Sequence, residues 1–223
     1  MLFRSALSHE INQPLTAAMN YTQASLRLIA MPEPDMERTK AAMRKSLEQI
    51  ERAGQIVHGL RDFMNKGELR LALTDVAEPV GDAMRLVAAE ANAGGIRLDI
   101  RDVDSLPPVM ADKTQLVQIL VNLMRNAIQA LVAAQMTGTV AVTGSLIDGK
   151  VEVAVSDNGP GIDPAVRTRL FEPFITTKSS GMGLGLSISR SIAEAHNGSL
   201  SVDYSVTGGT VFRIVLPAAH RVS

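Results

Sequence analysis

Apolar positions recur with a helical spacing over the first third of the chain. In residues 2–30 they step by three or four residues, which predicts an amphipathic helix with a stripe close to a heptad repeat. The stripe is formed by Leu7, Ile11, Leu15, Ala18, Thr22, Ser25 and Ile29. Two prolines within 31–34 interrupt this pattern, and a second amphipathic helix is predicted over about 35–64. Its stripe is formed by Met43, Leu47, Ile50, Val57, Leu60 and Met64.

Two long helices joined by a tight loop are expected to form an antiparallel hairpin. A single hairpin leaves half of its apolar surface exposed, and pairing two hairpins into a four-helix bundle buries that surface. We therefore expect residues 1–66 to be the dimerisation domain of a homodimer. Because the helical pattern is already under way at Leu2, we also expect the chain to be part of a longer protein or to have a very short amino-terminal end.

After about residue 68, short strands alternate with helices. Strands are predicted at 69–73, 96–102, 139–147, 150–156, 199–204 and 210–216, and helices from Asp75 to Ala93 and at 112–134, 164–170 and 184–196. This mixture predicts an α/β sandwich with a mixed sheet and helices on one face. The predicted organisation is a helical hairpin (1–66), a linker (67–72), an α/β domain (73–218) and a tail (219–223), with the chain loose from Pro217 onward.

Composition narrows the possible functions. The 223 residues are 46% apolar and 20% charged, with a net charge of −1, so the chain has no overall electrostatic attraction to nucleic acid or membranes. It contains no cysteine, which excludes disulfides and thiolate sites and fits the reducing cytoplasm. No uninterrupted apolar run approaches the roughly 18 residues of a membrane span. Aromatic residues make up only 3%, so stacking on nucleic-acid bases is not expected.

Two glycine-rich segments lie next to predicted elements. Asp157-Asn158-Gly159-Pro160-Gly161 follows a strand, and Gly181-Met182-Gly183-Leu184-Gly185 opens a helix. Small residues let backbone N–H groups approach a phosphate, and the amino end of a helix favours negative charge. A lone GxGxG is also typical of a flexible turn. Asp157 could accept hydrogen bonds from the amine of a base, or it could be an ordinary turn residue.

The strongly apolar helix at 112–134 carries two asparagines four residues apart, Asn122 and Asn126. Amides on a largely apolar helix are costly unless they find partners. They could pair within the core or lie on an exposed face. The functional interpretation is a Mg²⁺ ion held by an amide oxygen and by phosphate oxygens.

One histidine stands in a distinctive segment, Ser8-His9-Glu10-Ile11-Asn12-Gln13-Pro14-Leu15. At about 100° per residue, His9 lies roughly 200° around the helix from Leu7 and Ile11, so it is predicted to point toward solvent. Gln13 shares its face, and Pro14 is predicted to bend the helix. Alone, such a histidine is typical of an ordinary surface or capping residue. We assign no functional role to the other three histidines, which are His58, His196 and His220.

Taken together, these segments resemble a known family over nearly the whole chain. Residues 112–127, 157–161, 171–174 and 181–185 resemble, in order, the N, G1, F and G2 boxes of the Bergerat-fold ATP site. Gly208-Gly209-Thr210-Val211-Phe212 looks like the closing strand of that fold. His9-Glu10-Ile11-Asn12-Gln13-Pro14-Leu15 resembles the H box of sensor histidine kinases, and the set looks closest to the PAS-linked kinases of the FixL type.

The resemblance implies roles for individual residues. Asn126 matches the Mg²⁺-holding asparagine, with Asn122 as its usual companion, and Asp157 matches the acceptor of the adenine amine. The remaining matches are Gly159 and Gly161 beside the base; Gly181, Gly183, Leu184 and Gly185 on the phosphate side; Phe171 and Phe174 in the F box; Arg169 and Lys178 near the phosphates; and Met182 and Thr210 in the nucleotide pocket. Many relatives carry Lys or Arg at the position of Gln129, so Arg169 and Lys178 are expected to compensate for that missing charge.

The resemblance also implies a reaction. ATPases of this fold have a glutamate base four residues before the metal asparagine, and here that position is Asn122, which has no useful basicity. An exposed imidazole is mostly unprotonated at pH 7 and is a suitable nucleophile. We expect an ATP-dependent histidine kinase that phosphorylates His9, with Glu10 handling the ring proton, and passes the phosphoryl group to an Asp of a response-regulator receiver domain. Gln13 could position a water for the reverse, phosphatase reaction. The alternatives are a non-catalytic scaffold dimer and a plain ATPase.

Overall fold

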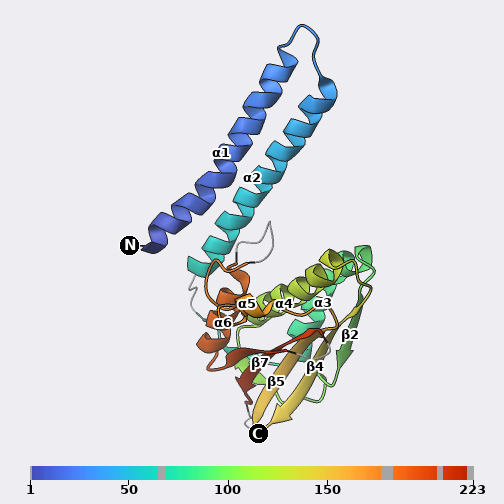
Figure 1. The fold of residues 1–223 in the computed structure, drawn as a ribbon. Coiled ribbons are helices and arrows are strands. Elements are labelled where there is room, and N and C mark those ends of the chain that lie inside the picture. Colours follow the sequence, from blue (N-terminus) through green and yellow to red (C-terminus); the bar gives the residue numbers. More distant parts are fainter. Residues whose placement is uncertain (1, 65–68, 177–182, 205–207, 220–223) are drawn as a thin grey trace. The chain divides into compact units, whose positions relative to one another are not determined.

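The structure, a computed structural model, describes residues 2–64, 69–176, 183–204 and 208–219, except for the side chains of residues 2–10, 52 and 55–64 (Figure 1). The chain divides into two compact units, a helical unit that ends at Lys66 and an α/β unit that begins at Gly67. Each unit is described by itself below.

The helical unit is the predicted hairpin. Helix α1 spans Leu2–Ile29 and α2 spans Met36–Met64, within one residue of the predicted limits (Figure 1). Helix α1 continues through Pro14. The second helix starts where the Asp35 carboxylate accepts a hydrogen bond from the Arg38 backbone N–H at 3.0 Å, which satisfies one of the free donors of the first turn.

Small residues, several of them hydroxylic, form the seam between the two helices. The small side chains buried in this seam are spaced by seven residues and are Ala18 and Ser25 on α1, and Thr39, Ser46 and Ala53 on α2. Pro14 of α1 is also buried. The Ser46 hydroxyl donates to the carbonyl of Ala18 at 3.0 Å, and its oxygen lies 2.9 Å from that of Thr22. Hydroxyls that bond to backbone carbonyls leave no polar group unpaired where the helices touch.

Most of the large apolar side chains of the hairpin lie outside this seam. The exposed ones include Leu15, Met19, Leu26, Ile29, Met36, Met43, Leu47 and Ile50. The predicted stripe therefore combines two faces, because Ala18 and Ser25 pack within the chain while Leu15 and Ile29 remain exposed. Heptad spacing alone does not separate the contact within a chain from a contact with another chain.

The α/β unit is built on a five-stranded mixed sheet with the order β2-β4-β5-β7-β6 (Figure 1). Its strands are β2 (Arg97–Arg101), β4 (Thr139–Ile147), β5 (Lys150–Asp157), β6 (Ser199–Tyr204) and β7 (Thr210–Pro217). Strand β2 pairs parallel to β4, and all other pairs are antiparallel. Helices α3 (Ala77–Ala93), α4 (Lys113–Ala133) and α6 (Gly185–Ala195) cover one face, which confirms the predicted fold class.

Alternation of buried and more exposed residues along β7 helps to build the core. On β7, every second residue is buried, and these residues pack with the valines of β5 against the apolar face of α4. The core includes Ile119, Leu123, Met124, Ile128 and Leu131 of α4 and Val151, Val153, Val155, Ile214 and Leu216 of the sheet. By length and composition, α4 is the one described helix that could cross a membrane. Eight of its side chains, including Leu116 and Leu131, are instead buried in this core.

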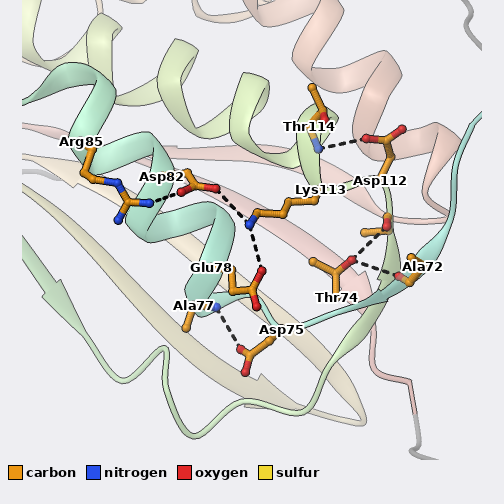
Figure 2. Close-up of polar contacts among 11 residues, drawn as sticks. Ala72, Thr74, Asp75, Ala77, Glu78, Asp82, Arg85, Asp112, Lys113 and Thr114 are labelled. Carbon is orange, nitrogen blue, oxygen red and sulfur yellow. Dashed lines mark hydrogen bonds and ion pairs between the residues drawn. The ribbon is translucent and has the colours of Figure 1, made fainter.

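A second, two-stranded sheet pairs β1 (Ala72–Thr74) with β3 (Val109–Ala111). Strand β1 starts later than the predicted strand 69–73, and β3 was not predicted. Figure 2 shows the Thr74 hydroxyl donating to the carbonyls of Ala72 and Ala111, each at 3.0 Å. A residue that bridges both strands in this way fixes a sheet too short to be stable by its own ladder.

The start of α4 is tied to α3 next to this small sheet (Figure 2). Asp112, where the helix was predicted to begin, is its N-cap, and its carboxylate accepts from the Thr114 backbone N–H at 2.9 Å. The Lys113 ammonium lies 2.9 Å from the Glu78 carboxylate and 3.2 Å from the Asp82 carboxylate, both on α3. These two carboxylates raise the pKa of Lys113. Because the groups are exposed, they contribute more to the orientation of the helices than to stability.

The end of the chain differs from the expectation of a loose tail from Pro217. Strand β7 includes Pro217, and the backbone N–H of Ala218 donates to Gly149 at 3.1 Å. The N–H of Ala219 donates to Pro108 at 2.7 Å. The expectation was wrong for residues 217–219 because their backbone groups find partners in loops that a sequence pattern does not place nearby.

Candidate functional site

Asp157 stands at the last position of β5 and begins the first glycine loop. Its carboxylate accepts from the Gly159 backbone N–H at 2.8 Å. Its paired residue on the neighbouring strand β7 is Thr210. Burial raises the pKa of Asp157, while hydrogen bonds from the backbone N–H groups of Gly159 and Thr210 oppose that rise. A half-buried carboxylate at a strand end can accept a hydrogen bond from an exocyclic amine.

The loop that precedes β7 packs against this first glycine loop, backbone on backbone. A Cβ atom on Gly209 would lie 2.3 Å from the carbonyl oxygen of Asp157, and a Cβ on Gly161 would lie 3.5 Å from the carbonyl oxygen of Gly209. Gly161 and Gly209 have φ values of 80° and 88°, which favour glycine. The structure thus brings together Asp157, Gly159, Gly161 and Thr210. Their role in nucleotide binding stays a prediction.

Asn122 and Asn126 lie one turn apart on α4, and both are partly buried. The Asn122 side-chain amide donates to the Ser189 hydroxyl of α6 at 2.9 Å. A Cβ on Gly185 would lie 2.3 Å from the Asn122 side-chain oxygen. The first residue of α6 is therefore a glycine because the Asn122 carboxamide occupies the space of its side chain. Sequence reasoning did not identify Ser189.

The F box is joined to the second glycine segment. The backbone N–H of Phe174 donates to the carbonyl of Gly183 at 3.0 Å, and a Cβ on Gly183 would lie 2.5 Å from the carbonyl carbon of Phe174. Phe171 packs edge to face on Phe212 of β7, with 6.5 Å between ring centroids. The Arg190 guanidinium of α6 lies over the ring of Phe171, 4.5 Å from its centroid. The F box is thereby fixed to the sheet and to α6.

Three of the basic or polar candidates have specific surroundings. Arg169 is exposed and pairs with the Glu172 carboxylate at 2.8 Å. The Gln129 amide donates to Glu90 of α3 at 3.3 Å. Gln13 is exposed on α1.

Several predicted site residues lie outside what the structure describes. Lys178, Gly181 and Met182 are not among the described residues. His9 and Glu10 belong to α1, but their side chains are outside the description. The predicted direction of His9 toward solvent therefore stays a prediction. Leu184 is buried at the start of α6.

His196 is buried and connects α6 to the start of α4 through hydrogen bonds. Its Nε2 atom accepts from the Asp112 backbone N–H at 3.0 Å, so its Nδ1–H donates to the carbonyl of Ile192 at 2.8 Å. This arrangement requires a neutral ring, rather than the positive charge that a helix carboxyl end would favour. His196 is thus accounted for by structure, in line with the absence of an assigned functional role.

The donor set fits a magnesium ion that is held largely by a bound nucleotide. Among the described residues, no group of three His, Cys, Asp or Glu side chains is placed to hold a metal. Mg²⁺ is usually bound by one or two protein oxygens, several waters and substrate phosphates. A single amide oxygen from Asn126 meets that requirement.

A mixed sheet covered on one face by helices, with glycine loops at a strand end and at a helix start, defines a nucleotide-binding domain of the Bergerat class. The chain matches the His Kinase A (phospho-acceptor) domain family over residues 2–68 and the histidine kinase-, DNA gyrase B- and HSP90-like ATPase family over residues 111–220. The chain therefore belongs to the sensor histidine kinase family.

Two relatives illustrate this membership. The chain is 41% identical over 218 residues to the sensor protein FixL of Bradyrhizobium diazoefficiens, a match that covers 97% of this chain and 43% of FixL. It is 40% identical to the C4-dicarboxylate transport sensor protein DctS of Rhodobacter capsulatus, covering 97% of this chain and 33% of DctS. The chain thus spans less than half the length of either protein.

Two solved histidine kinases share the fold over almost the whole chain. Full-length ShkA in complex with AMPPNP is 28% identical with a TM-score of 0.68, and the match covers 98% of this chain and 46% of ShkA. ThkA in complex with the response regulator TrrA is 25% identical with a TM-score of 0.75, covering 97% of this chain and 61% of ThkA.

Proposed function

We propose that this chain is the core of an ATP-dependent protein histidine kinase of a two-component system, acting in the cytoplasm. ATP binds in the α/β unit, and its γ-phosphoryl group is transferred to His9 of the helical unit. The phosphorylated histidine then passes the group to an aspartate of a response-regulator receiver domain. The domain limits we propose are 1–66 for the phosphoacceptor hairpin and 73–218 for the ATP-binding domain.

The observation that carries this proposal is the engagement of Asn122. ATPases of this fold have a glutamate at that position to activate water. Here the side chain is an amide whose nitrogen donates to Ser189 at 2.9 Å. An amide bound in this way removes no proton from a water molecule. ATP in such a site is expected to hydrolyse slowly and to remain available to another nucleophile.

The nucleotide is proposed to bind between the first glycine loop and the start of α6. Asp157 accepts from the adenine amine, Thr210 lines the pocket, and Gly159 and Gly161 let the backbone pass close to the base. The phosphates are assigned to the segment from Gly181 to Gly185, which includes Met182 and Leu184. Mg²⁺, when bound with ATP and held by Asn126, supplies charge neutralisation of the phosphates.

Further residues are proposed to act on the phosphate side. Phe171 and Phe174 anchor the segment that covers ATP, and the cations Arg169 and Lys178 compensate for the neutral Gln129. The exposed Arg169 would exchange its ion pair with Glu172, at 2.8 Å, for a phosphate. Exchange of an exposed pair costs little because such pairs contribute at most about 1 kcal/mol.

The chemistry needs little from the protein beyond placement of the reacting atoms. A neutral ring nitrogen of His9 attacks the γ-phosphorus in line, and the bond from phosphorus to the bridging oxygen of ADP breaks. The ring then carries both a phosphoryl group and an N–H proton, and Glu10 accepts that proton. Phosphohistidine and ADP are the products.

A homodimer is proposed because the hairpin exposes the side chains that a bundle would bury. Leu26, Met43, Leu47 and Ile50 have exposed fractions of 53–62%, whereas the buried residues described between the two helices are mostly small. Burying a leucine, isoleucine or methionine fully is worth about 1.5–3 kcal/mol, so the eight exposed side chains named above favour association strongly in each copy. The partner that matches this face is a second copy of the chain.

The response regulator is proposed from the reaction and from one relative. A phosphohistidine is a high-energy donor that needs an acceptor, and no receiver-like segment was recognised in the sequence. The solved complex of ThkA with the response regulator TrrA shows that a kinase of this fold binds such a protein.

The direct test is incubation with ATP labelled at the γ-phosphate. Acid-labile, base-stable label should appear on the wild type and on His58→Gln, a matched substitution in the same unit, and should be absent from His9→Gln. Asn126→Asp should also abolish labelling while the dimer stays folded by circular dichroism. Acid-labile label on His9→Gln would overturn the proposal, and fast steady-state release of phosphate would favour a plain ATPase.

A phosphatase activity toward the regulator is a second candidate, and the observation behind it is the position of Gln13. Its side chain is exposed on α1, one turn after His9. An exposed amide there can orient a water toward a phosphoaspartate. Decay of regulator phosphate should be about tenfold slower with Gln13→Ala than with the wild type, and equal decay rates would exclude this role.

A further inference from the structure

Helices α4 and α6 are linked by a polar contact on their facing sides. The Asn122 amide donates to the Ser189 hydroxyl at 2.9 Å, and Ser189 is only 2% exposed. The two residues lie 67 positions apart in the sequence. The geometry of this pair is defined from the Ser189 side, because the buried hydroxyl cannot turn to water instead, while Asn122 is partly buried.

The same carboxamide lies directly against the first residue of α6. A Cβ on Gly185 would lie 2.3 Å from the Asn122 oxygen and 3.1 Å from its nitrogen. Ser189 is one helical turn after Gly185, so both residues present one face of α6 to Asn122. The hydrogen bond to Ser189 thereby sets how the carboxamide lies over the start of α6.

Helix α6 is held to α4 at its other end as well. The buried ring of His196, directly after α6, accepts from the backbone N–H of Asp112, directly before α4. The two helices therefore run in opposite directions and are joined at two points. Of these, only the Asn122–Ser189 contact lies near Gly185, where the phosphates are proposed to bind, and one turn from Asn126.

We propose that Ser189 is a positioning residue for the phosphate end of the nucleotide site, and that Asn122 acts through it rather than as a ligand of the nucleotide. This inference rests on the proposed function. The Ser189 hydroxyl fixes the Asn122 carboxamide as a spacer between α4 and α6. The spacer sets the distance between the first backbone N–H groups of α6 and the Asn126 side chain.

Loss of the Ser189 hydroxyl should affect the phosphate end of the nucleotide site and not the adenine end. Without Ser189 as acceptor, a partly buried amide N–H₂ lacks its partner, and the carboxamide must turn or shift. The start of α6 then moves relative to Asn126. The adenine end, formed by Asp157 and Thr210, is built on β5 and β7 and does not use this contact. Phosphate binding should therefore weaken, while binding of the base should not.

The test measures binding of ATP with Mg²⁺, and of adenosine alone, by titration calorimetry on the full chain. Ser189→Ala should raise the dissociation constant for ATP by roughly fivefold to twentyfold and that for adenosine by less than about twofold. Ser187→Ala is the matched control. It is a serine of the same helix, 8% exposed, whose hydroxyl donates to the carbonyl of Leu184 within the same helix turn. For this variant, the ratio of the dissociation constants for ATP and adenosine should stay within about twofold of the wild-type ratio.

A second variant separates position from stability. Ser189→Thr keeps the hydroxyl but adds a methyl group in a buried place, so it should lower the melting temperature yet retain the wild-type ratio of ATP to adenosine affinity. In turnover, Ser189→Ala should raise KM for ATP more than it lowers kcat.

Each outcome decides between alternatives. An unchanged affinity ratio in Ser189→Ala, or an equal loss for ATP and adenosine, overturns the inference and leaves the proposed function standing. A loss of ATP binding in Ser187→Ala as large as in Ser189→Ala also overturns it. Failure of the wild type to bind ATP overturns the proposed function and the inference together. If Ser189→Thr does not fold, the comparison of Ser189→Ala with Ser187→Ala still decides.

Discussion

The two units of this chain solve the problem of close packing in opposite ways. In the hairpin, small residues such as Ala18 and Ser46 fill the seam, and leucine, isoleucine and methionine side chains remain exposed. In the α/β unit, the large side chains are buried in one core, and glycines are kept for backbone contacts at the site. The α/β unit thus completes its own core, whereas the hairpin needs a second surface.

The largest effect is expected where the hairpin is incomplete. Leu47→Glu places a charge on the exposed apolar face. The dissociation constant of the proposed dimer should therefore rise by at least about a hundredfold, and labelling of His9 should fall with it. ATP binding should be unchanged. Sedimentation and ATP titration measure both quantities. The control is Leu86→Glu on α3, where the leucine is 62% exposed in the other unit. A dimer that tolerates Leu47→Glu as well as Leu86→Glu would refute this role for the face.

The next largest effect is expected at the backbone contact of the glycine loops. Gly209→Ala introduces a Cβ 2.3 Å from the Asp157 carbonyl at a φ of 88°, so it should destabilise the α/β unit by about 2–4 kcal/mol and abolish ATP binding. Gly149→Ala is the control, because its φ is 71° but no atom lies within 4 Å. It should cost only about 1 kcal/mol and leave ATP binding intact. Chemical denaturation and calorimetry give the two values. If both variants lose the same free energy of unfolding, the loss comes from the positive φ alone and not from the close contact with the Asp157 carbonyl.

A smaller effect is expected at Asp157, where one substitution should weaken ATP binding and yet stabilise the protein without ATP. Asp157→Asn should weaken ATP binding by at least about tenfold, because an amide replaces the acceptor of the adenine amine. The same change should stabilise the empty protein at pH 7.

The sign follows from the raised pKa of Asp157 in the folded state. A raised pKa means that the folded protein holds the proton more tightly than the unfolded chain, so stability is lost as the pH rises through the folded pKa. The gain in melting temperature of Asp157→Asn should therefore be present at pH 7 and vanish below the unfolded pKa of 3.8. A gain that persists at pH 3 would refute this cause.

The smallest effect is expected at the α3–α4 ion pairs of Lys113. Lys113→Gln should lower the melting temperature only slightly at low salt and not at all in 1 M salt, because exposed pairs are screened. The pKa of Lys113 is raised, so its contribution is constant below pH 10.5 and is lost only above that value. Melting curves at pH 7 and 9 should show the same difference. A large, salt-independent loss would contradict a role limited to orientation.

Sequence reasoning succeeded where one signal is local and strong. The helix predicted at 112–134 and the strands predicted at 139–147 and 150–156 match α4, β4 and β5 within about a residue. It failed for β3, because three residues after two prolines carry no periodicity of their own. Strand β3 exists only because Thr74 and β1 lie beside it.

The site was predicted as far as motifs reach. Asp157, Gly159, Gly161 and Thr210 do come together, because they flank two strands that pair. Ser189 and the Gly209 contact could not be predicted, since each depends on a residue distant in the sequence and on a separation of a few ångströms. The seam of the hairpin could not be told from its exposed face either, because both obey the same heptad spacing.

The exposed apolar face of the hairpin has a consequence for the order of events during synthesis. The described contacts of the hairpin join two helices that follow each other in the sequence, so it is expected to fold in microseconds to milliseconds, whereas the ribosome needs on the order of ten seconds to make the residues after Lys66. Throughout that interval the face is available, and the sheet with its pairing of distant strands is still incomplete. Two neighbouring nascent chains can therefore pair through their hairpins before either has an ATP site.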